Sequence, residues 1–263
     1  MAIGAWFDGA MPRRGETVKA YVLGIHQHWL DEQRQHSNAG PATGATLSHI
    51  RIETRFHYNL DIESLPAMVP SVIALLLLML PAMLTALSVV REKAVGSIIN
   101  LYVTPVSRAE FLLGKQLPYV ALAMLNFAFM CMVAVLVLRV PMKGSLALLS
   151  AAAALLYSFA TTGMGLLASA VTKSQIAAMF IAALGTLVPA TQFSGLITPV
   201  SSLEGVGRAI GEIYPATYMV RTSGGVFTKG LGLEHLFDLL LPLLLSIPVI
   251  FLAALYLLPK QER

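Results

Sequence analysis

The chain is apolar in five long stretches, which are separated by shorter polar segments. These stretches cover residues 68–90, 117–138, 146–171, 176–197 and 236–258. A helix of about 20 residues is long enough to cross the roughly 30 Å hydrocarbon core of a bilayer. Each stretch therefore predicts a transmembrane helix, and residues 65–263 together predict an all-α membrane domain with five spans.

Residues 1–64 are more polar and predict a different kind of structure. Residues 16–35 predict an amphipathic helix, because apolar side chains recur there at helical spacing. These side chains are Val18, Val22, Ile25 and Trp29. Residues 47–58 contain the alternation that is typical of a strand. We therefore expect a small α+β region before the membrane domain.

The most polar segment inside the membrane domain, residues 91–116, lies between the first two spans. It starts as an amphipathic helix with apolar residues on one face. These residues are Val95, Ile98, Ile99 and Tyr102. Thr104-Pro105 ends this helix, since proline has no N–H and disfavours a helical residue before it. Ser107, with Glu110 three residues later, is a capping box that starts a second helix leading back into the membrane.

A second long connection, residues 199–235, follows the fourth span. Three of its apolar residues recur at helical spacing: Val206, Ile210 and Ile213. They predict a short helix at the membrane interface, which Tyr214-Pro215 ends.

The composition agrees with a membrane protein. Hydrophobic residues make up 56% of the chain and charged residues only 12%, against about 25% charged in soluble domains. The net charge is +4, but the basic residues are dispersed along membrane edges, so no nucleic-acid partner is expected. Cys131 is the single cysteine, which excludes an internal disulfide. His26 and His28 lie on different faces of their helix, so no metal site is predicted.

The distribution of Lys and Arg predicts the orientation. If residues 1–64 are outside, the inner segments carry Arg91, Lys93, Arg108, Lys115, Lys173, Lys260 and Arg263. The outer connections carry Arg139, Lys143, Arg208, Arg221 and Lys229. The excess at the inner span ends places segment 91–116 in the cytoplasm.

At this segment the chain resembles the permease subunits of ABC-2 type transporters. That family carries the run REK-x-x-G-[ST]-[IL]-x-x-L-x-V-[ST]-P-[VIL], followed by F-x-x-G-K. The matching residues are Arg91-Glu92-Lys93, Gly96-Ser97-Ile98, Leu101, Val103-Thr104-Pro105-Val106, Phe111 and Gly114-Lys115. Hydrophobicity alone would not produce polar and proline residues at these spacings. The resemblance extends from about Tyr58 to the C-terminus.

The resemblance implies a multi-pass protein of the bacterial inner membrane. It places residues 1–64 outside the cytoplasm, between the first and second spans of the family. No apolar stretch of span length precedes residue 68, so we expect a truncated chain or a first span supplied otherwise, and favour truncation. The resemblance also implies an outer-gate helix at Ile210, Tyr214 and Pro215.

The sequence contains no phosphate-binding loop, because Gly114-Lys115 lacks the upstream glycine and the following Ser or Thr. No catalytic residue and no bound cofactor are therefore predicted, and ATP with Mg²⁺ would be held by a partner subunit. The resemblance implies that this ATPase docks on segment 91–116. The residues expected to couple with it are Arg91, Glu92, Lys93, Gly96, Ser97, Ile98, Leu101, Thr104 and Pro105.

Within this set, Glu92 would pair with a basic group of the ATPase, and the apolar residues would fill a groove on it. The alternative is an interfacial helix whose basic residues only contact anionic lipid head groups.

The interior of the spans carries no charged side chain, which argues against a proton relay or ion pump. The polar residues there include Asn126 and residues 161–163, which we interpret as helix-packing positions. A candidate substrate path comprises Thr191, Gln192 and Ser194. Pro189 and Gly195 can interrupt the helix close to it.

We therefore interpret the chain as the permease subunit of an ABC-2 type exporter. It would act as a homo- or heterodimer of permeases with ATPase subunits, and would export a hydrophobic or amphipathic substrate. Two alternatives stay open. The chain could be an inactive permease fragment, or a membrane anchor that assembles an ATPase without transport.

Overall fold

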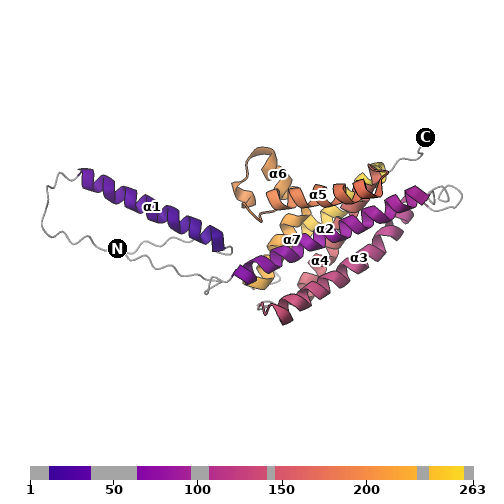
Figure 1. Cartoon of the computed structure of the whole chain (residues 1–263), viewed down its shortest axis with the longest axis horizontal. Helices are drawn as coiled ribbons and strands as arrows, with labels where there is room; N and C mark the ends of the chain where they lie inside the picture. The colour runs from indigo at the N-terminus through magenta and orange to yellow at the C-terminus, as the bar shows by residue number, and fades with distance from the viewer. Residues whose placement is uncertain (1–11, 37–63, 96–106, 141–145, 230–236, 258–263) are drawn as a thin grey trace. The chain divides into compact units, whose positions relative to one another are not determined.

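The structure is a computed structural model that describes residues 12–36, 64–95, 107–140, 146–229 and 237–257 (Figure 1). The chain divides by its contacts into two units, Met1–Met68 and Val69–Arg263. In the first unit, helix α1 (Pro12–His36) confirms the predicted amphipathic helix. The predicted strand at residues 47–58 lies outside the described residues.

Five long apolar helices build the second unit, and each is long and apolar enough to cross a membrane. They are α2 (Ser64–Val95), α3 (Arg108–Met132) with the π-helical turn η2 (Val133–Val137), α4 (Leu146–Ala170), α5 (Gln175–Phe193) and α8 (Phe237–Leu257). The five predicted spans are thereby confirmed, although their ends differ. Helix α2 continues past residue 90 because Arg, Glu, Lys and Ala are good helix formers. Helix α5 stops at Phe193 because Gly195 has a φ of +88°, a left-handed conformation that ends helices.

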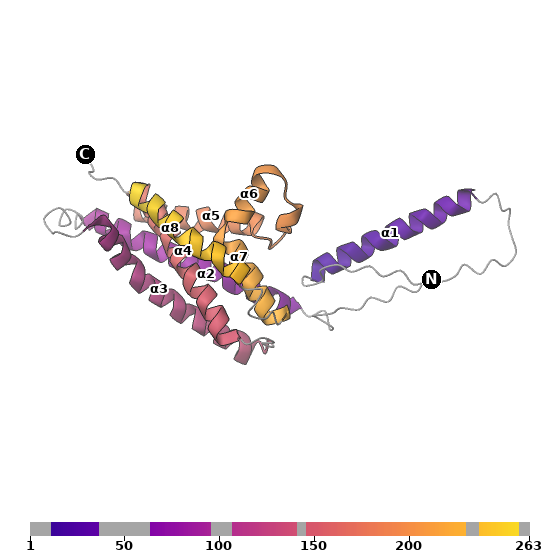
Figure 2. The same cartoon turned by 180° about the vertical axis from the view of Figure 1, so that it is seen from behind.

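Helix α4 lies at the centre of this unit and contacts α3, α5, α7 and α8 (Figures 1 and 2). The face of its middle that is fully buried carries small residues and one large aromatic residue, Tyr157. The small residues are Ala153, Ala154, Ser158, Ala160, Thr161 and Thr162. The Tyr157 hydroxyl donates a hydrogen bond of 3.2 Å to the carbonyl oxygen of Ala74 in α2. A buried phenol needs such a partner, since an unpaired polar group inside the membrane is costly.

Two glycines of α4 permit close helix packing. A Cβ atom added at Gly165 would lie 2.3 Å from the carbonyl oxygen of Ala82 in α2. A Cβ atom added at Gly163 would lie 2.9 Å from Cγ2 of Ile250 in α8. Small residues at such crossings let backbones approach, which is a main source of association energy between membrane helices.

The outward faces of the spans are strongly apolar. Exposed large hydrophobic side chains recur every three or four residues along α3, α5 and α8, as in Ile176, Phe180, Leu184 and Val188 of α5. In water such continuous stripes would drive association, whereas lipid tails solvate them. The helices thus have the surface of a membrane domain.

The connection between α5 and α8 contains more helix than the sequence predicted. It comprises η3 (Val200–Ser202), α6 (Gly205–Ile213), α7 (Pro215–Gly224) and η4 (Gly225–Lys229). Helix α6 confirms the predicted short helix that Tyr214 ends. Helix α7 was not predicted, although Pro215 stands at its first position, where proline favours the start of a helix.

Helices α3 and α4 are joined by a buried polar contact. The Nε2 atom of Gln116 donates to the carbonyl oxygen of Phe159 at 2.7 Å and to Oγ1 of Thr162 at 3.0 Å. Thr162 also donates its own hydroxyl to the carbonyl oxygen of Ser158 at 2.7 Å. Residues 161–163 therefore do pack helices together, as the sequence predicted.

We expect the substitution Gln116→Leu to lower stability by about 1 kcal/mol, which is typical of one interhelical hydrogen bond in a membrane protein. The thermal midpoint of the purified protein in detergent measures this. Gln192→Leu is a matched control, because Gln192 is exposed. Equal midpoints for the two variants would contradict a stabilising role of the Gln116 contact.

Candidate functional site

The first part of the predicted coupling segment is the last turn of α2. Arg91, Glu92 and Lys93 continue the helix of the span without a break up to Val95. A force applied to the following segment therefore acts directly on the end of a membrane-spanning helix. The Arg91 side chain is exposed, whereas those of Glu92 and Lys93 are half-buried.

Glu92 has a partner within the chain. Its Oε1 atom accepts a hydrogen bond from Nζ of Lys115 in α3, and the two groups form an ion pair. Each side chain is only 29% exposed, so water screens this pair less than it screens a fully exposed one. The sequence predicted that Glu92 pairs with the ATPase and that Lys115 lies at an inner span end, but it did not predict their contact. The pairing of Glu92 with an ATPase stays a prediction.

Lys93 connects α2 to the end of α4. Its Nζ atom donates a hydrogen bond of 2.8 Å to the carbonyl oxygen of Ser169. Ser169 lies in the last turn of α4, where carbonyl oxygens lack helical partners and the helix dipole attracts a cation. Two neighbouring residues of the same turn thus bind two different helices.

An apolar cluster lies at the same helix ends. It joins Val89 of α2, Leu112 of α3, Leu166 of α4 and Ala254 of α8, all of them buried. Val89 is three residues before Glu92, and Leu166 is three residues before Ser169. One turn of α2, of α3 and of α4 therefore supplies both an apolar and a polar contact.

The start of α3 confirms the predicted capping box. The Ser107 hydroxyl accepts a hydrogen bond from the Glu110 backbone N–H at 3.3 Å. The Glu110 carboxylate accepts one from the Ser107 backbone N–H at 2.7 Å. This cap fixes where the chain re-enters a helix after the coupling segment. The remaining predicted coupling residues, Gly96, Ser97, Ile98, Leu101, Thr104 and Pro105, lie outside the described residues.

The predicted outer-gate residues lie in the last turn of α6 (Ile210), between the two helices (Tyr214) and at the start of α7 (Pro215). The Tyr214 hydroxyl donates a hydrogen bond of 2.7 Å to the carbonyl oxygen of Thr186 in α5. Burial raises the pKa of this hydroxyl well above its usual value, so it remains a proton donor. Pro215 is buried and Ile210 is exposed. Tyr214 therefore fixes this hairpin to a span, whereas a gating role stays a prediction.

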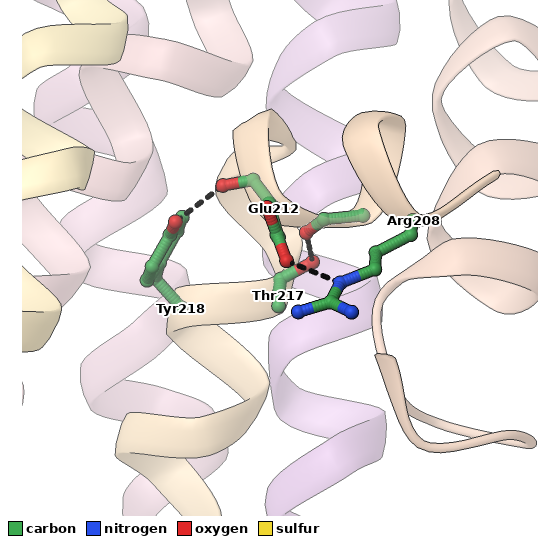
Figure 3. Close-up of polar contacts among 5 residues, drawn as sticks. Arg208, Glu212, Thr217 and Tyr218 are labelled. Carbon is green, nitrogen blue, oxygen red and sulfur yellow. Dashed lines mark hydrogen bonds and ion pairs between the residues drawn. The ribbon is translucent and has the colours of Figure 1, made fainter. Parts of the chain in front are cut away.

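Helix α6 has three distinct faces. Gly207 and Gly211 face Phe193, and the backbone there is so close that a Cβ atom on Gly211 would lie 2.7 Å from the Phe193 carbonyl oxygen. Arg208 and Glu212 form an exposed ion pair at 2.8 Å (Figure 3). The third face exposes Val206, Ile210 and Ile213.

The turn from α6 into α7 is held by hydrogen bonds to backbone carbonyl oxygens (Figure 3). The Thr217 hydroxyl donates to the carbonyl oxygen of Gly211 at 2.7 Å, and the Tyr218 hydroxyl donates to that of Glu212. These carbonyl oxygens belong to the last turn of α6, where no backbone N–H group of the same helix is available to bind them. Side chains of α7 therefore complete the end of α6.

The predicted substrate-path residues lie in the last turn of α5 and directly after it. Thr191 donates its hydroxyl to the carbonyl oxygen of Val188 at 3.0 Å, and Gln192 is exposed. Ser194 is fully buried, and its hydroxyl has no hydrogen-bond partner among the described residues. Their role in a substrate path stays a prediction.

A groove of about 320 Å³ lies elsewhere, between α2, α3 and α5. It is lined by Leu80, Pro81, Met83, Leu84, Leu87, Tyr119, Leu122, Ala123, Asn126 and Met179. Its walls are apolar except where Tyr119 and Asn126 bring a hydroxyl and a carboxamide. The sequence did not predict this groove, because its residues come from three spans that only the tertiary structure brings together.

Among the described residues, no three His, Cys, Asp or Glu side chains lie close enough together to bind a metal ion. The site therefore consists of the end of α2, which is bound by polar contacts to α3 and α4, and of an apolar groove between α2, α3 and α5. Together with five apolar helices of span length, this arrangement is that of a multi-pass membrane protein.

Comparison with known proteins gives the family. The profile described as ABC-2 type transporter matches residues 39–227. The chain belongs to the ABC-2 type transporter family and is a multi-pass protein of the inner membrane. Comparison with solved structures finds no significant match.

Several curated relatives carry permease names. The chain is 34% identical over 247 residues to the probable multidrug ABC transporter permease YbhS of Escherichia coli. This match covers 94% of this chain and 62% of YbhS. It is 27% identical over 187 residues to the probable multidrug ABC transporter permease YbhR of Escherichia coli, covering 71% of this chain and 50% of YbhR. It is 29% identical over 189 residues to the inner membrane transport permease YhhJ of Escherichia coli, and this match covers 70% of this chain and 49% of YhhJ. The chain thus spans less than two thirds of the length of these relatives.

Proposed function

We propose that this chain is the permease subunit of an ATP-driven exporter, in which a separate ATP-binding subunit docks on segment 91–116 and a second permease completes the pathway. The observation that carries the proposal is the family match over the coupling motif, together with the direct continuation of that motif from a membrane span. The chain itself contributes the spans, and the ATPase contributes the energy of ATP hydrolysis.

The first test is to search the neighbouring genes for one that encodes a phosphate-loop ATPase, and the second is to co-express that ATPase with the affinity-tagged permease. We expect the ATPase to co-purify with the permease from detergent-solubilised membranes. In liposomes, the complex should hydrolyse ATP and move a lipophilic compound across the bilayer. A complex that hydrolyses ATP without transport would favour the assembly-factor alternative, and an absence of any complex would favour the inactive fragment.

For the substrate, we propose a hydrophobic or amphipathic molecule with a hydrogen-bonding group. The groove between α2, α3 and α5 supports this class, because it offers apolar walls with a carboxamide at Asn126. Met179 lies near the start of α5, just after the connection that carries Lys173, so this end of the groove is the cytoplasmic one in the expected orientation. A substrate dissolved in the inner leaflet could enter there directly.

We expect the substitution Asn126→Leu to raise the KM of export about fivefold, since the loss of one hydrogen bond costs about 1 kcal/mol. Initial export rates at several concentrations of a neutral lipophilic dye with one carbonyl group, such as Nile red, measure this. Asn126→Gln is the matched control, because it keeps the carboxamide. If both variants behave alike, the groove does not bind substrate through this group.

A further inference from the structure

The end of α2 is bound on two sides, and this arrangement suggests how movement passes into the membrane. Glu92 binds Lys115 of α3, which is 23 residues away in the sequence. Lys93 binds the carbonyl oxygen of Ser169 at the end of α4, which is 76 residues away. Segment 96–106 leaves α2 directly after these residues and leads into α3 at Ser107. The two contacts therefore lie at the base of the coupling segment.

The positions of Glu92 and Lys93 on α2 determine which neighbouring helix each side chain contacts. Glu92 and Lys93 are adjacent, so their side chains leave the helix about 100° apart and can reach two different neighbours at once. Lys115 lies about two turns inside α3, and its long side chain extends its ammonium group toward the helix end where Glu92 lies. Glu92 and Lys93 thus contact two different helices, α3 and α4.

The apolar contacts beneath them support a joint movement. Val89, Leu112 and Leu166 bring α2, α3 and α4 together within one turn of the polar contacts. Apolar contacts hold helices together without fixing their rotation or sliding, because they have no direction. The directional contacts of Glu92 and Lys93 fix the register of the three helix ends.

We propose that Glu92 and Lys93 are positioning residues that tie α2 to α3 and α4, so that a displacement of segment 96–106 moves these three spans as one body. This inference rests on the proposed function, because the displacement would come from the ATPase. It adds a role within the permease for the acidic and basic residues of the motif. Arg91, whose side chain is exposed, remains available for contact with the partner.

The test uses spin labels at exposed positions close to the contacts of Glu92 and Lys93. Cysteines at Ala94 and Leu113 report the distance between α2 and α3, and cysteines at Ala94 and Val171 report that between α2 and the end of α4. The native Cys131 is replaced by alanine in all variants. Distances are measured by pulsed electron paramagnetic resonance on the full chain in complex with its ATPase, without nucleotide and with a trapped ATP analogue.

In the unmodified chain, both distances should have narrow distributions that do not change with nucleotide. In Glu92→Gln, the 94–113 distance should broaden and shift by about 2 Å or more with nucleotide, while the 94–171 distance stays unchanged. In Lys93→Met, only the 94–171 distance should change. The exchanged pair, Glu92→Lys with Lys115→Glu, should restore the narrow 94–113 distance.

A double variant that removes the exposed outer ion pair, Arg208→Gln with Glu212→Gln, is the matched control and should leave both distances unchanged. Unchanged distances in Glu92→Gln, or no restoration by the exchanged pair, would overturn the inference. The distances without nucleotide are also measured on the purified permease alone, and this comparison does not depend on the ATPase. A failure of the proposed function would instead appear as an absence of ATPase from the purified unmodified permease.

Discussion

Replacing Glu92 by arginine is expected to reduce co-purification of the ATPase about fivefold or more while leaving membrane insertion unchanged. The new cation would face Lys115, next to Lys93, in a position where the native carboxylate is only 29% exposed. Repulsion between two cations at such a partly screened site costs about 1–3 kcal/mol. A cost of about 1 kcal/mol corresponds to a fivefold loss of binding, and a cost of about 1.4 kcal/mol to a tenfold loss. Insertion should persist, since added basic charge on the cytoplasmic side agrees with the preferred orientation.

Immunoblotting for the ATPase on the tagged permease measures this effect, with the amount of permease in the membrane fraction as reference. Glu212→Arg is the matched charge reversal, because Glu212 belongs to an exposed ion pair with Arg208 on a distant segment. Combining Glu92→Arg with Lys115→Glu should restore binding if Glu92 acts through its own chain. If Glu92 contacts the ATPase instead, the second substitution should not help. Normal co-purification of the single variant would count against any role in docking.

The second large effect is expected for Gly165→Ala. The added methyl group would lie 2.3 Å from the Ala82 carbonyl oxygen and 3.0 Å from Cβ of Thr85, so the backbones of α2 and α4 would have to separate. Such overpacking costs about 1–3 kcal/mol, and at this distance we expect the upper end of that range. The thermal midpoint in detergent should fall by about 5 °C or more.

Gly185 provides a matched control for this substitution. It lies inside α5, and a Cβ atom added there would meet nothing within 4 Å. Because alanine favours helix over glycine by about 1 kcal/mol, Gly185→Ala should leave the midpoint unchanged or raise it. Equal decreases for the two variants would contradict the close crossing of α2 and α4.

The sequence predicts the spans and several helix boundaries well, because those depend on local patterns. Hydrophobic length predicts the five spans, and the capping box at Ser107 and Glu110 predicts the start of α3. The end of α5 differs from the prediction because the positive φ of Gly195 outweighs the apolar residues that follow Phe193. Tyr214-Pro215 was read only as a helix end, whereas the same proline also starts α7.

The tertiary contacts of the site could not be predicted from such patterns. The pairs of Glu92 with Lys115 and of Lys93 with the Ser169 carbonyl join residues far apart in the sequence. Lys93 and Lys115 are both equally plausible as residues at a membrane edge. Their charge alone therefore does not identify the group that each of them binds. The groove around Asn126 depends on how α2, α3 and α5 cross, and single spans carry no signal of it.

The central claim is that the polar segment after α2 is where the ATPase engages the permease. A photocrosslinking amino acid at position 91 tests it most directly, since the Arg91 side chain is exposed at the start of that segment. After illumination of cells that express both subunits, we expect a covalent product of the permease with the ATPase. Products with lipid only, or labelling of this position by a membrane-impermeant reagent added outside intact spheroplasts, would contradict the claim.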